Sequence, residues 1–587
     1  MSNQEISKLL RNVAASFTIK NEKKFRFQII AYQKASDSIG NLTSELKDLY
    51  KEEKLELLPG VGVSIRDHLI ELFKTGKVKH FEWALKDIPK SVFVLLDIPG
   101  FGPKKAYRLV KEFGINDPEK VISSLEKIAK RGEIASLPGF GEKSQSDILR
   151  SINEFKKGVG KTTRMTLPYA QEIAEKIVNY LKKSKHVVLA ESLGSLRRRM
   201  ATVGDIDIAV ASAKPKEVIN HFVAYSYKDR VIEKGEVTAS LLVSGGRQID
   251  LMVQPPESFG SLLQHFTGSK AHNVALREFA LKKGLSLSEY GIKKKNKLQK
   301  FETEEKFYAA LGLDWIPPEL RENTGEIEKA LEHNLPKLVA LSDIKGDLHI
   351  HSSYPIEPSH DLGKASFEEM LRKAISLGYE YIGFSEHNPS MSKHDSNEIF
   401  EIIAKRNKEI EQLNKSNKSI RVLKLLETDI TPNGKLAISN ECLDLLDATI
   451  VSIHSGFGMD KKSMTKRVLT GLSHKKAKIL AHPTGRMLNE RPGFDLDWEE
   501  IFDFCKKHNK ALEINSWPSR LDLPGSIIKM AVENKVKMII NTDSHALWQM
   551  NLMKYGVEIA RRGWATKNDI LNTLGYNDFV KWLKGGE

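Results

Sequence analysis

Side chains of the kinds that bind divalent metal ions recur along the C-terminal half of the chain. They are His349, His351, Glu386, His387, Glu427, His454, His482, Asp543 and His545. Because residues i and i+2 of a strand point to the same face, His349 and His351 can offer two ligands to one ion, as can Asp543 and His545. A lone His-x-His pair is more often hydrogen bonded or solvated than part of a metal site.

Several of these residues directly follow an apolar run. His454 follows residues 448–453, His482 follows 479–481, and Asp543 follows 538–542. Buried parallel strands that end in polar ligands are how a β/α barrel builds a site on its C-terminal face. The spacing therefore predicts a metal site at the carboxyl ends of parallel strands.

Three aspartates of the first half could hold two further metal ions. Asp205 and Asp207 share one face of a strand predicted around residues 206–210, and Asp250 lies in a later apolar segment. Three carboxylates at this spacing suit two Mg²⁺ ions, which support in-line displacement at a phosphate. A lone Asp-x-Asp is more often two surface aspartates, so the neighbouring residues must decide.

Those neighbours favour a nucleotide site. Gly194-Ser195 forms a predicted turn, and Arg198 follows it before Gly204 and Asp205. Backbone amides of the turn and the two-pronged guanidinium of Arg198 would hold the β- and γ-phosphates.

One short pattern occurs three times near the N-terminus. The copies are Leu58-Pro59-Gly60-Val61-Gly62, Ile98-Pro99-Gly100-Phe101-Gly102 and Leu137-Pro138-Gly139-Phe140-Gly141. Each precedes a stretch with apolar residues three or four apart, which predicts helix, glycine-rich turn, helix. Glycines let the backbone come close to a phosphate, and the amides that open the next helix point toward it. Any single copy could be a plain helix cap, whereas three copies indicate DNA backbone contacts through Gly60, Gly62, Gly100, Gly102, Gly139 and Gly141.

The charge distribution agrees with a polyanion partner for the first half. Residues 1–300 carry 52 lysines and arginines against 34 acidic residues, while residues 301–587 carry 39 against 42. A solvated lysine-rich exterior is the alternative explanation of the charge alone.

With two cysteines, no apolar run long enough for a membrane span and no signal peptide at the N-terminus, we expect a cytoplasmic protein without a disulfide framework.

Taken together, these motifs resemble those of bacterial family X DNA polymerases that carry a C-terminal polymerase and histidinol phosphatase (PHP) domain. The resemblance spans nearly the whole chain. Its strongest segments are Gly194 to Asp207, Phe266-Thr267-Gly268-Ser269, His272-Asn273 with Arg277, Glu289-Tyr290-Gly291 and the histidine series. It implies a short-gap-filling DNA repair polymerase whose PHP domain acts as a 3′-5′ exonuclease and incises abasic sites.

The resemblance also implies a multidomain α+β and α/β fold. The expected parts are a helix-hairpin-helix domain over 1–80, a helical domain with two such motifs over 81–158, a nucleotidyltransferase palm with a mixed sheet over 159–255, a nucleotide-selecting thumb over 256–320, a linker over 321–342, and a distorted (β/α)7 PHP barrel over 343–587. The expected partners are gapped or primer-template DNA and a dNTP, with no membrane. We expect a monomer associated with the bacterial nucleoid.

Residue roles follow from the resemblance. Asp205, Asp207 and Asp250 would bind two Mg²⁺ ions, with Asp250 as base for the primer 3′-hydroxyl, and Gly194, Ser195, Arg198 and Gly204 would hold the triphosphate. Phe266, Gly268 and Asn273 would line the sugar and base pocket, and Arg277 would approach the template. The nine residues of the C-terminal series would bind up to three Mn²⁺ or Zn²⁺ ions, with Glu427 as the bridge and Arg486 or Arg520 near the phosphate.

Several positions depart from the family pattern. Arg199 and Met252 replace a glycine and an arginine beside the palm site, which predicts a slow or selective polymerase, and His265 replaces a tyrosine, which predicts looser sugar discrimination. His68 stands where related lyases have a lysine, so we expect no deoxyribose-phosphate lyase through it.

In the PHP part, Glu386 replaces an aspartate, and Pro355-Ile356-Glu357 replaces a usual Ser-Asp-Gly, so a weakened PHP site is an alternative. Two functional alternatives also stay open. The chain could be a DNA-bound scaffold with an inactive palm, or its PHP domain could hydrolyse small phosphoesters.

Overall fold

The computed structural model describes residues 1–587 except 2, 41–45, 47–49, 51–52, 54, 58–60, 99–100, 157–163, 244–246, 489–492 and 586–587. Gly60 and Gly100 therefore lie outside the described residues. The chain divides into two compact units, Met1–Thr163 and Arg164–Glu587. Among the described residues, no helix has both the length and the apolar character that a membrane crossing requires.

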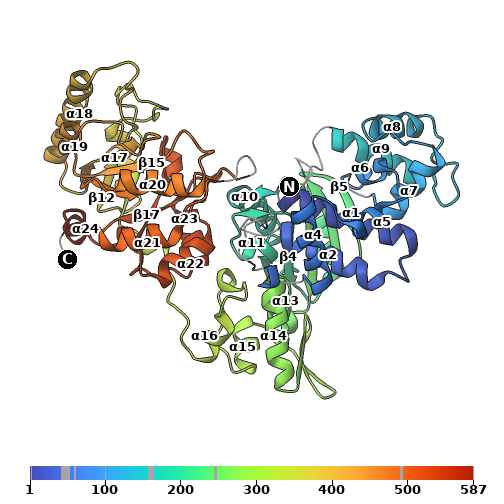
Figure 1. Ribbon diagram of the computed structural model, residues 1–587. Coiled ribbons are helices and arrows are strands. Elements are labelled where there is room, and N and C mark those ends of the chain that lie inside the picture. Colours follow the sequence, from blue (N-terminus) through green and yellow to red (C-terminus); the bar gives the residue numbers. More distant parts are fainter. Residues whose placement is uncertain are drawn as a thin grey trace. The chain divides into compact units, whose positions relative to one another are not determined.

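The first unit is helical (Figure 1). Its helices are α1 (Asn3–Asn21), α2 (Arg26–Gly40), α4 (Val63–Thr75), α5 (Lys79–Leu85), α6 (Lys90–Leu95), α7 (Pro103–Glu112), α8 (Val121–Lys130) and α9 (Glu142–Lys156). Two apolar clusters hold them together, one built on α1, α2 and α4 and one on α6 to α9. The apolar spacing of Ile65, Leu69 and Leu72 turns one face of α4 into the first cluster, as predicted from the sequence.

The second unit begins with a five-stranded mixed sheet in the order β2-β4-β7-β6-β5. Its elements are α10 (Leu167–Leu181), β2 (Leu189–Ser192), α11 (Gly194–Arg197), β4 (Ile206–Ala211), α12 (Pro215–Val223), β5 (Lys228–Lys234), β6 (Thr238–Val243) and β7 (Arg247–Gln254), with a short β1 (Met165–Thr166) and β3 (Thr202–Val203) beside them. The central pair β4 and β7 is parallel, and its register places Asp207 directly opposite Asp250. This pairing brings together aspartates that are distant in sequence.

The segment after the sheet forms a small subdomain (Figure 1). It contains α13 (Phe259–Thr267), α14 (Lys270–Lys282), the hairpin strands β8 (Leu285–Ser288), β9 (Gly291–Lys294) and β10 (Lys297–Gln299), α15 (Glu304–Ala310), the 3₁₀ turn η3 (Pro318–Leu320) and α16 (Glu326–Leu331). The segment expected to be a linker thus contains a helix. Ile327 and Ala330 of α16 pack into the core of this subdomain.

The remainder is a ring of parallel strands with helices between them. Its elements are β11 (Gly346–Ile350), α17 (Phe367–Ser376), β12 (Tyr381–Phe384), α18 (Ser396–Ser416), β13 (Arg421–Lys424), β14 (Glu427–Asp429), α19 (Asn440–Asp444), β15 (Thr449–Ser452), α20 (Lys461–Leu472), β16 (Ala477–Leu480), α21 (Trp498–Lys507), β17 (Ala511–Asn515), α22 (Gly525–Glu533), β18 (Met538–Asn541), α23 (Met553–Arg562) and α24 (Tyr576–Leu583).

Strands β11 to β13 form one parallel sheet and β14 to β18 another. Parallel bridges join the two sheets at His387 with Glu427 and at Ile350 with Ser544. With β13 and β14 taken as one interrupted strand, the ring has seven strands. The mixed sheet, the helical N-terminal region and the parallel C-terminal sheets confirm the predicted combination of α+β and α/β folds.

Candidate active sites and nucleic-acid interface

The buried carboxylate of Glu427 is the centre of the C-terminal cluster. Glu427 is the first residue of β14. Five imidazoles at the ends of other strands of the ring point toward its carboxylate. The nearest nitrogens lie at 3.1 Å for His349, 3.6 Å for His351, 3.0 Å for His387, 3.3 Å for His454 and 3.0 Å for His482. Burial raises the pKa of Glu427, but His387, His349 and His454 outweigh it and hold that pKa well below its usual range. A carboxylate shared by so many rings can bridge two metal ions.

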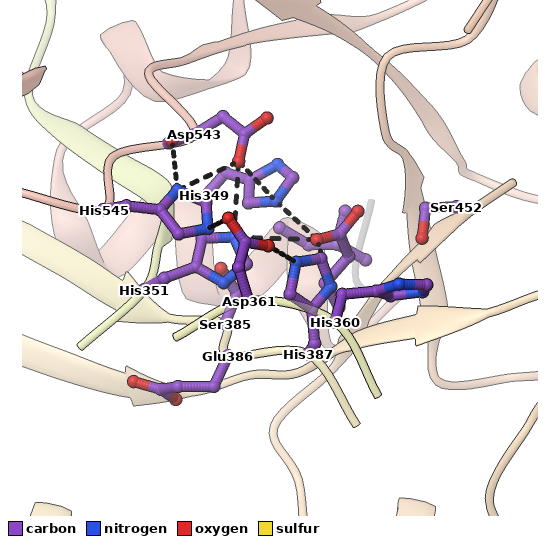
Figure 2. Close-up of polar contacts among 12 residues, drawn as sticks. His349, His351, His360, Asp361, Ser385, Glu386, His387, Ser452, Asp543 and His545 are labelled. Atoms are coloured by element: carbon purple, nitrogen blue, oxygen red, sulfur yellow. Dashed lines mark hydrogen bonds and ion pairs between the residues drawn. The ribbon is translucent and has the colours of Figure 1, made fainter. Parts of the chain in front are cut away.

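Among the described residues, four groups of ligand atoms in and beside this centre lie close enough to hold an ion. They are His351 with His387 and His545, His349 with His351 and Asp543, His387 with Glu427 and His454, and His360 with Asp429 and His454. Figure 2 shows the side chains of His349, His351, His387, Asp543 and His545 turned toward one another. Eight of the nine predicted ligands therefore converge.

Several donor atoms of the cluster face one another without forming a hydrogen bond, which fits metal binding. The buried atoms His349 Nε2, His351 Nδ1 and Nε2, His387 Nδ1, Glu427 Oε2, His482 Nδ1 and His545 Nε2 have no hydrogen-bond partner. A buried polar atom without a partner is costly unless a ligand satisfies it. Nitrogen and carboxylate oxygen donors at this density are the set that transition-metal and zinc sites use.

Asp361 completes the cluster and was missed by the sequence reasoning. Its carboxylate lies 3.1 Å from His387 Nε2 and 3.3 Å from His545 Nε2. These two histidines lower the pKa of Asp361 despite its partial burial. The signal in the sequence is Asp361-Leu362-Gly363, which follows Pro355-Ile356-Glu357, the segment that replaces the usual Ser-Asp-Gly, by a few residues.

The prediction that Glu386 is a metal ligand is wrong. Its carboxylate accepts hydrogen bonds from Arg406 Nε at 2.7 Å and from the backbone amide of Ser352 at 3.1 Å. Figure 2 shows this carboxylate directed away from the histidines. Glu386 precedes His387 on the chain, and alternation along an extended segment turns the two side chains in opposite directions.

Glu513 of β17 orients the cluster from behind. Its carboxylate lies 2.7 Å from His349 Nδ1 and accepts a hydrogen bond from the backbone amide of His482 at 2.7 Å. Holding Nδ1 leaves the Nε2 atom of His349 for a metal ion. Asp429 serves His454 in the same way, with its Oδ1 at 2.6 Å from Nδ1.

Replacing Glu513 with glutamine should weaken metal binding about 10- to 100-fold, because the amide orients His349 without the charge that makes the ring a stronger ligand. Chelator competition measured on the whole chain tests this. Glu499→Gln on the exposed start of α21 is the matched control and should leave affinity unchanged. Equal affinities for Glu513→Gln and the parent chain would contradict the assigned role.

The two arginines expected near the phosphate differ in position. Arg520 Nε lies 3.7 Å from Asp543 and therefore reaches the cluster. Arg486 instead donates from Nε to the carbonyl of Arg520 at 2.9 Å and to that of Leu521. Arg486 thus supports the loop that carries Arg520, and the expectation that it contacts phosphate is not supported.

In the first sheet, Asp205 immediately precedes β4, Asp207 lies near the start of β4, and Asp250 lies opposite Asp207 on the neighbouring strand β7. Burial and, to a smaller extent, the nearby charges of Asp205 and Asp250 together raise the pKa of Asp207 to about 7. Asp250 accepts hydrogen bonds from Gln248 Nε2 at 3.0 Å and from Ser240 Oγ, which hold its carboxylate in place. Accumulated negative charge at a half-buried site favours a bound cation.

The predicted phosphate-binding turn lies beside these carboxylates. A Cβ on Gly194, whose φ is +56°, would approach Asp207 Oδ2 to 3.0 Å, so glycine is required there. Ser195 follows in the first turn of α11. A Cβ on Gly268 would lie 3.1 Å from Arg198 Nη1, which places Gly268 against the guanidinium of Arg198.

Arg164 is a further arginine at this site. It donates to Thr202 Oγ1 at 2.8 Å and to the Thr202 carbonyl at 2.7 Å. Burial lowers its pKa, while nearby Asp205 raises it. A Cβ on Gly204 would meet Arg164 Nη1 at 3.4 Å. The sequence reasoning missed Arg164 because it precedes the strand motif by a whole helix.

The expected base pocket is assembled around α13 and α14. Asn273 Oδ1 accepts from Gln264 Nε2 at 2.9 Å, and its Nδ2 donates to the carbonyl of His265 at 2.7 Å. Arg277 Nη2 lies 3.3 Å from His265 Nδ1, and the ring of Phe266 meets that of His265 edge on. Phe266, Asn273 and Arg277 therefore surround His265, and their role in a base pocket stays a prediction.

A buried ion triad fastens the turn to the thumb. Glu304 accepts from Arg197 Nη2 at 2.8 Å and from Arg321 Nη1 at 2.6 Å. Burial alone would raise the pKa of Glu304, but the two arginines outweigh it and lower the pKa to about 2.

Replacing Glu304 with glutamine should destabilise this subdomain by about 3–5 kcal/mol, because the buried Arg321 and the largely buried Arg197 lose their counter-charge. Since the folded pKa is depressed, this contribution is present above about pH 4.5 and is lost as the pH falls toward about 2. Urea unfolding can be followed by the fluorescence of Trp315, whose Nε1 lies 3.2 Å from Glu304. Glu302→Gln, which removes an exposed pair with Lys306, is the control and should leave the midpoint unchanged.

Three helices begin directly after the glycine-rich turns. Gly62 precedes α4, Gly102 precedes α7 and Gly141 precedes α9. A Cβ on any of the three would meet nothing within 4 Å, and none has a positive φ. Their packing and backbone conformation do not require glycine, so the missing side chain leaves room for a close external partner. Gly139 differs, because its φ of +79° is a strained conformation for other residues.

Replacing Gly102 with alanine should weaken binding to gapped duplex DNA about threefold to tenfold, because a methyl group then blocks the approach of one phosphate. The fold should not change, since the space around Gly102 is open. Fluorescence anisotropy with labelled DNA measures the effect. Gly458→Ala, at an equally open glycine of the other unit, should bind as the parent does.

His68 lies in a ring cluster of the first unit. Its Nδ1 is 2.9 Å from Tyr32 Oη, and its ring stacks on His80 at 4.6 Å. Burial and His80 lower the pKa of His68. The absence of lyase chemistry through this residue stays a prediction.

Comparisons with known proteins agree with this architecture. Family descriptions match over residues 1–78 (Helix-hairpin-helix domain), 93–154 (SAM-like Helix-hairpin-helix tandem), 262–322 (DNA polymerase beta thumb) and 347–517 (PHP domain). The chain is 23% identical over 310 residues to DNA polymerase lambda of Rattus norvegicus, which covers 49% of each protein. It is 24% identical over 237 residues to a probable phosphatase of Thermoanaerobacter sp. (strain X514), covering 39% of this chain and 89% of that protein.

One similarity extends from end to end. The chain is 33% identical over 588 residues to the DNA polymerase/3′-5′ exonuclease PolX of Bacillus subtilis (strain 168), and the aligned region covers 100% of both proteins. With the polymerase thumb and PHP matches added, the chain belongs to the family X DNA polymerases that carry a PHP domain.

Proposed function

We propose that this chain is a DNA-directed DNA polymerase that fills short gaps during DNA repair and trims 3′ ends with its PHP domain. The observation that carries the proposal is the presence of two separate sites with different donor chemistry. Asp205, Asp207 and Asp250 offer only oxygen, while the PHP cluster offers mainly histidine nitrogen around Glu427. Oxygen-only donors suit Mg²⁺, and mixed nitrogen and oxygen donors suit Mn²⁺ or Zn²⁺.

In the palm, the chain's own groups position the reactants. Arg198 and the turn at Gly194 and Ser195 face the triphosphate, and Asp250 accepts the proton of the primer 3′-hydroxyl. Gln248 and Ser240 hold Asp250 in the orientation for that transfer. Phe266 and Asn273 line the sugar and base side, with Arg277 toward the template.

Divalent ions held by either site would activate the attacking oxygen and neutralise charge on the phosphate. In the PHP domain, His349, His351 and Asp543 would hold one ion, His387, Glu427 and His454 a second, and His351, His387 and His545 a third, with Asp361 and His482 beside them. Arg520 lies close enough to take remaining phosphate charge. An abasic-site incision would use the same groups, since it also cleaves a phosphodiester.

The N-terminal unit would hold the DNA backbone through its glycine-rich turns. We propose the domain limits 1–80, 81–158, 159–255, 256–320 and 343–587, with 321–342 between thumb and PHP domain. Because Ile327 and Ala330 of α16 pack into the core of the thumb, we assign the segment 321–342 to the thumb.

Assays of the whole chain on matched substrates test the proposal. With Mg²⁺ and dNTPs, a one-nucleotide gap should be filled, and with Mn²⁺ a recessed 3′ end should be shortened. Small phosphomonoesters form the second arm, because the similarity to a probable phosphatase covers most of that protein. Faster hydrolysis of phosphomonoesters than of 3′ ends would overturn the exonuclease assignment. Elemental analysis of the same sample reports the bound metals.

A further inference from the structure

Helix α23 of the PHP domain contacts the nucleotide-binding turn of the palm. Glu558 and Arg562 are four residues apart and therefore lie on one face of this helix. Glu558 pairs with Arg199 at 3.5 Å, and Arg562 donates to the backbone carbonyl of Arg198. Two consecutive residues of the turn are thus held by one helix of another domain.

The guanidinium of Arg198 is already occupied. Its Nε lies 3.0 Å from a carboxylate oxygen of Glu322, and its Nη1 donates to the carbonyl of Thr267. The Arg198 side chain is 13% exposed and that of Glu322 is 28% exposed, so water screens this pair only in part. A triphosphate that binds Arg198 through Nε must replace the carboxylate of Glu322, and one that binds through Nη2 shares the guanidinium with it, so in either case the two anions compete for the same charge.

Arg562 gives Glu322 a second partner. Its Nη2 lies 3.1 Å from the same oxygen of Glu322 that faces Arg198. Glu322 can therefore leave Arg198 and keep a counter-charge, so the exchange does not strand a buried carboxylate. This sharing makes displacement by a phosphate feasible.

We propose that Glu322, held by Arg562 of the PHP domain, competes with the incoming triphosphate for Arg198 and so couples nucleotide affinity to the contact between PHP domain and palm. The inference rests on the proposed role of Arg198 in triphosphate binding. Arg199, which replaces a small residue of the family pattern, strengthens the same contact through Glu558. Glu322 is a positioning residue, since it acts through Arg198.

Steady-state incorporation on gapped DNA tests the competition. Glu322→Gln should lower the KM for the dNTP about threefold to tenfold with little change in kcat, because the competing charge is gone. Glu322→Asp keeps the charge and should stay close to the parent KM. Glu332→Gln, which removes an exposed pair with Lys329 on the neighbouring helix, is the matched control and should change neither constant. An unchanged or higher KM for Glu322→Gln would overturn the inference.

Arg198→Gln separates this inference from the proposed function. A raised KM for this variant supports the assignment of Arg198, and the outcome for Glu322→Gln then decides the competition alone. An unchanged KM for Arg198→Gln would remove the triphosphate role and the inference with it.

The coupling has a reciprocal effect that needs no variant. Because linkage acts in both directions, a bound nucleotide that frees Glu322 from Arg198 should leave this carboxylate to Arg562 alone and tighten that pair. Amide exchange over Met553–Arg562 should therefore slow when a non-incorporable dNTP analogue is added to the complex of the whole chain with gapped DNA. Unchanged or faster exchange in this segment would contradict the coupling.

Discussion

Replacing Glu427 with glutamine should reduce the 3′-5′ exonuclease rate by about three orders of magnitude, since each decade is worth about 1.4 kcal/mol and metal ions contribute several kcal/mol to such reactions. Five histidine nitrogens within 3.6 Å depend on this carboxylate for their arrangement. An amide has the same shape, but it lacks the charge that lets one side chain serve two ions.

The measurement is release of labelled nucleotides from a 3′ end, with metal content determined on the same sample. Incorporation by the palm should stay within about twofold of the parent, since the two sites use separate residues. Glu368→Gln, an exposed glutamate at the start of α17, serves as the control and should keep full nuclease activity. Retained exonuclease activity in Glu427→Gln would show that the cluster is not the nuclease site.

The second large effect is expected at Asp207. Asp207→Asn should lower nucleotide incorporation by about three orders of magnitude, because a ligand to both ions loses its charge. The raised pKa of Asp207, about 7, shows how strongly burial and the adjacent carboxylates disfavour a further negative charge at this point. Removing that charge should therefore not destabilise the sheet.

Single-nucleotide incorporation is the assay, and thermal unfolding checks the fold. The exonuclease should persist in Asp207→Asn, which is the reverse of the pattern expected for Glu427→Gln. Asp229→Asn on the exposed strand β5 should behave as the parent. If the parent chain itself incorporated no more nucleotide than Asp207→Asn, the scaffold hypothesis would replace the polymerase hypothesis.

Local patterns in the sequence were sufficient for much of the architecture. The strands that carry Asp207 and Asp250 were expected from apolar runs, and the helices after Gly62 and Gly102 from apolar spacing. These features depend on period and on glycine, which act over a few residues. For the same reason, eight of the nine residues predicted to be PHP ligands do converge in the structure, since each stands at the end of a strand or in a short motif.

Site residues whose role depends on contacts with distant parts of the chain could not be predicted from such local patterns. Asp361 enters the cluster through a loop, and Arg406 from α18 binds Glu386 and keeps it out. The carboxylates of Asp361 and Glu386 could both bind a metal ion. Contacts with distant residues decide that Asp361 joins the cluster and that Glu386 does not.

The sequence by itself determined the family, the order of the domains and the kinds of metal ligand, because ligand type and repeat spacing can be recognised within short stretches of sequence. The tertiary structure decided which carboxylate joins the histidines, that Glu513 orients them, and that Glu322 and Arg562 meet at Arg198. The physical reason is that a buried charged side chain pairs with the nearest opposite charge, and folding can bring that partner from any part of the chain.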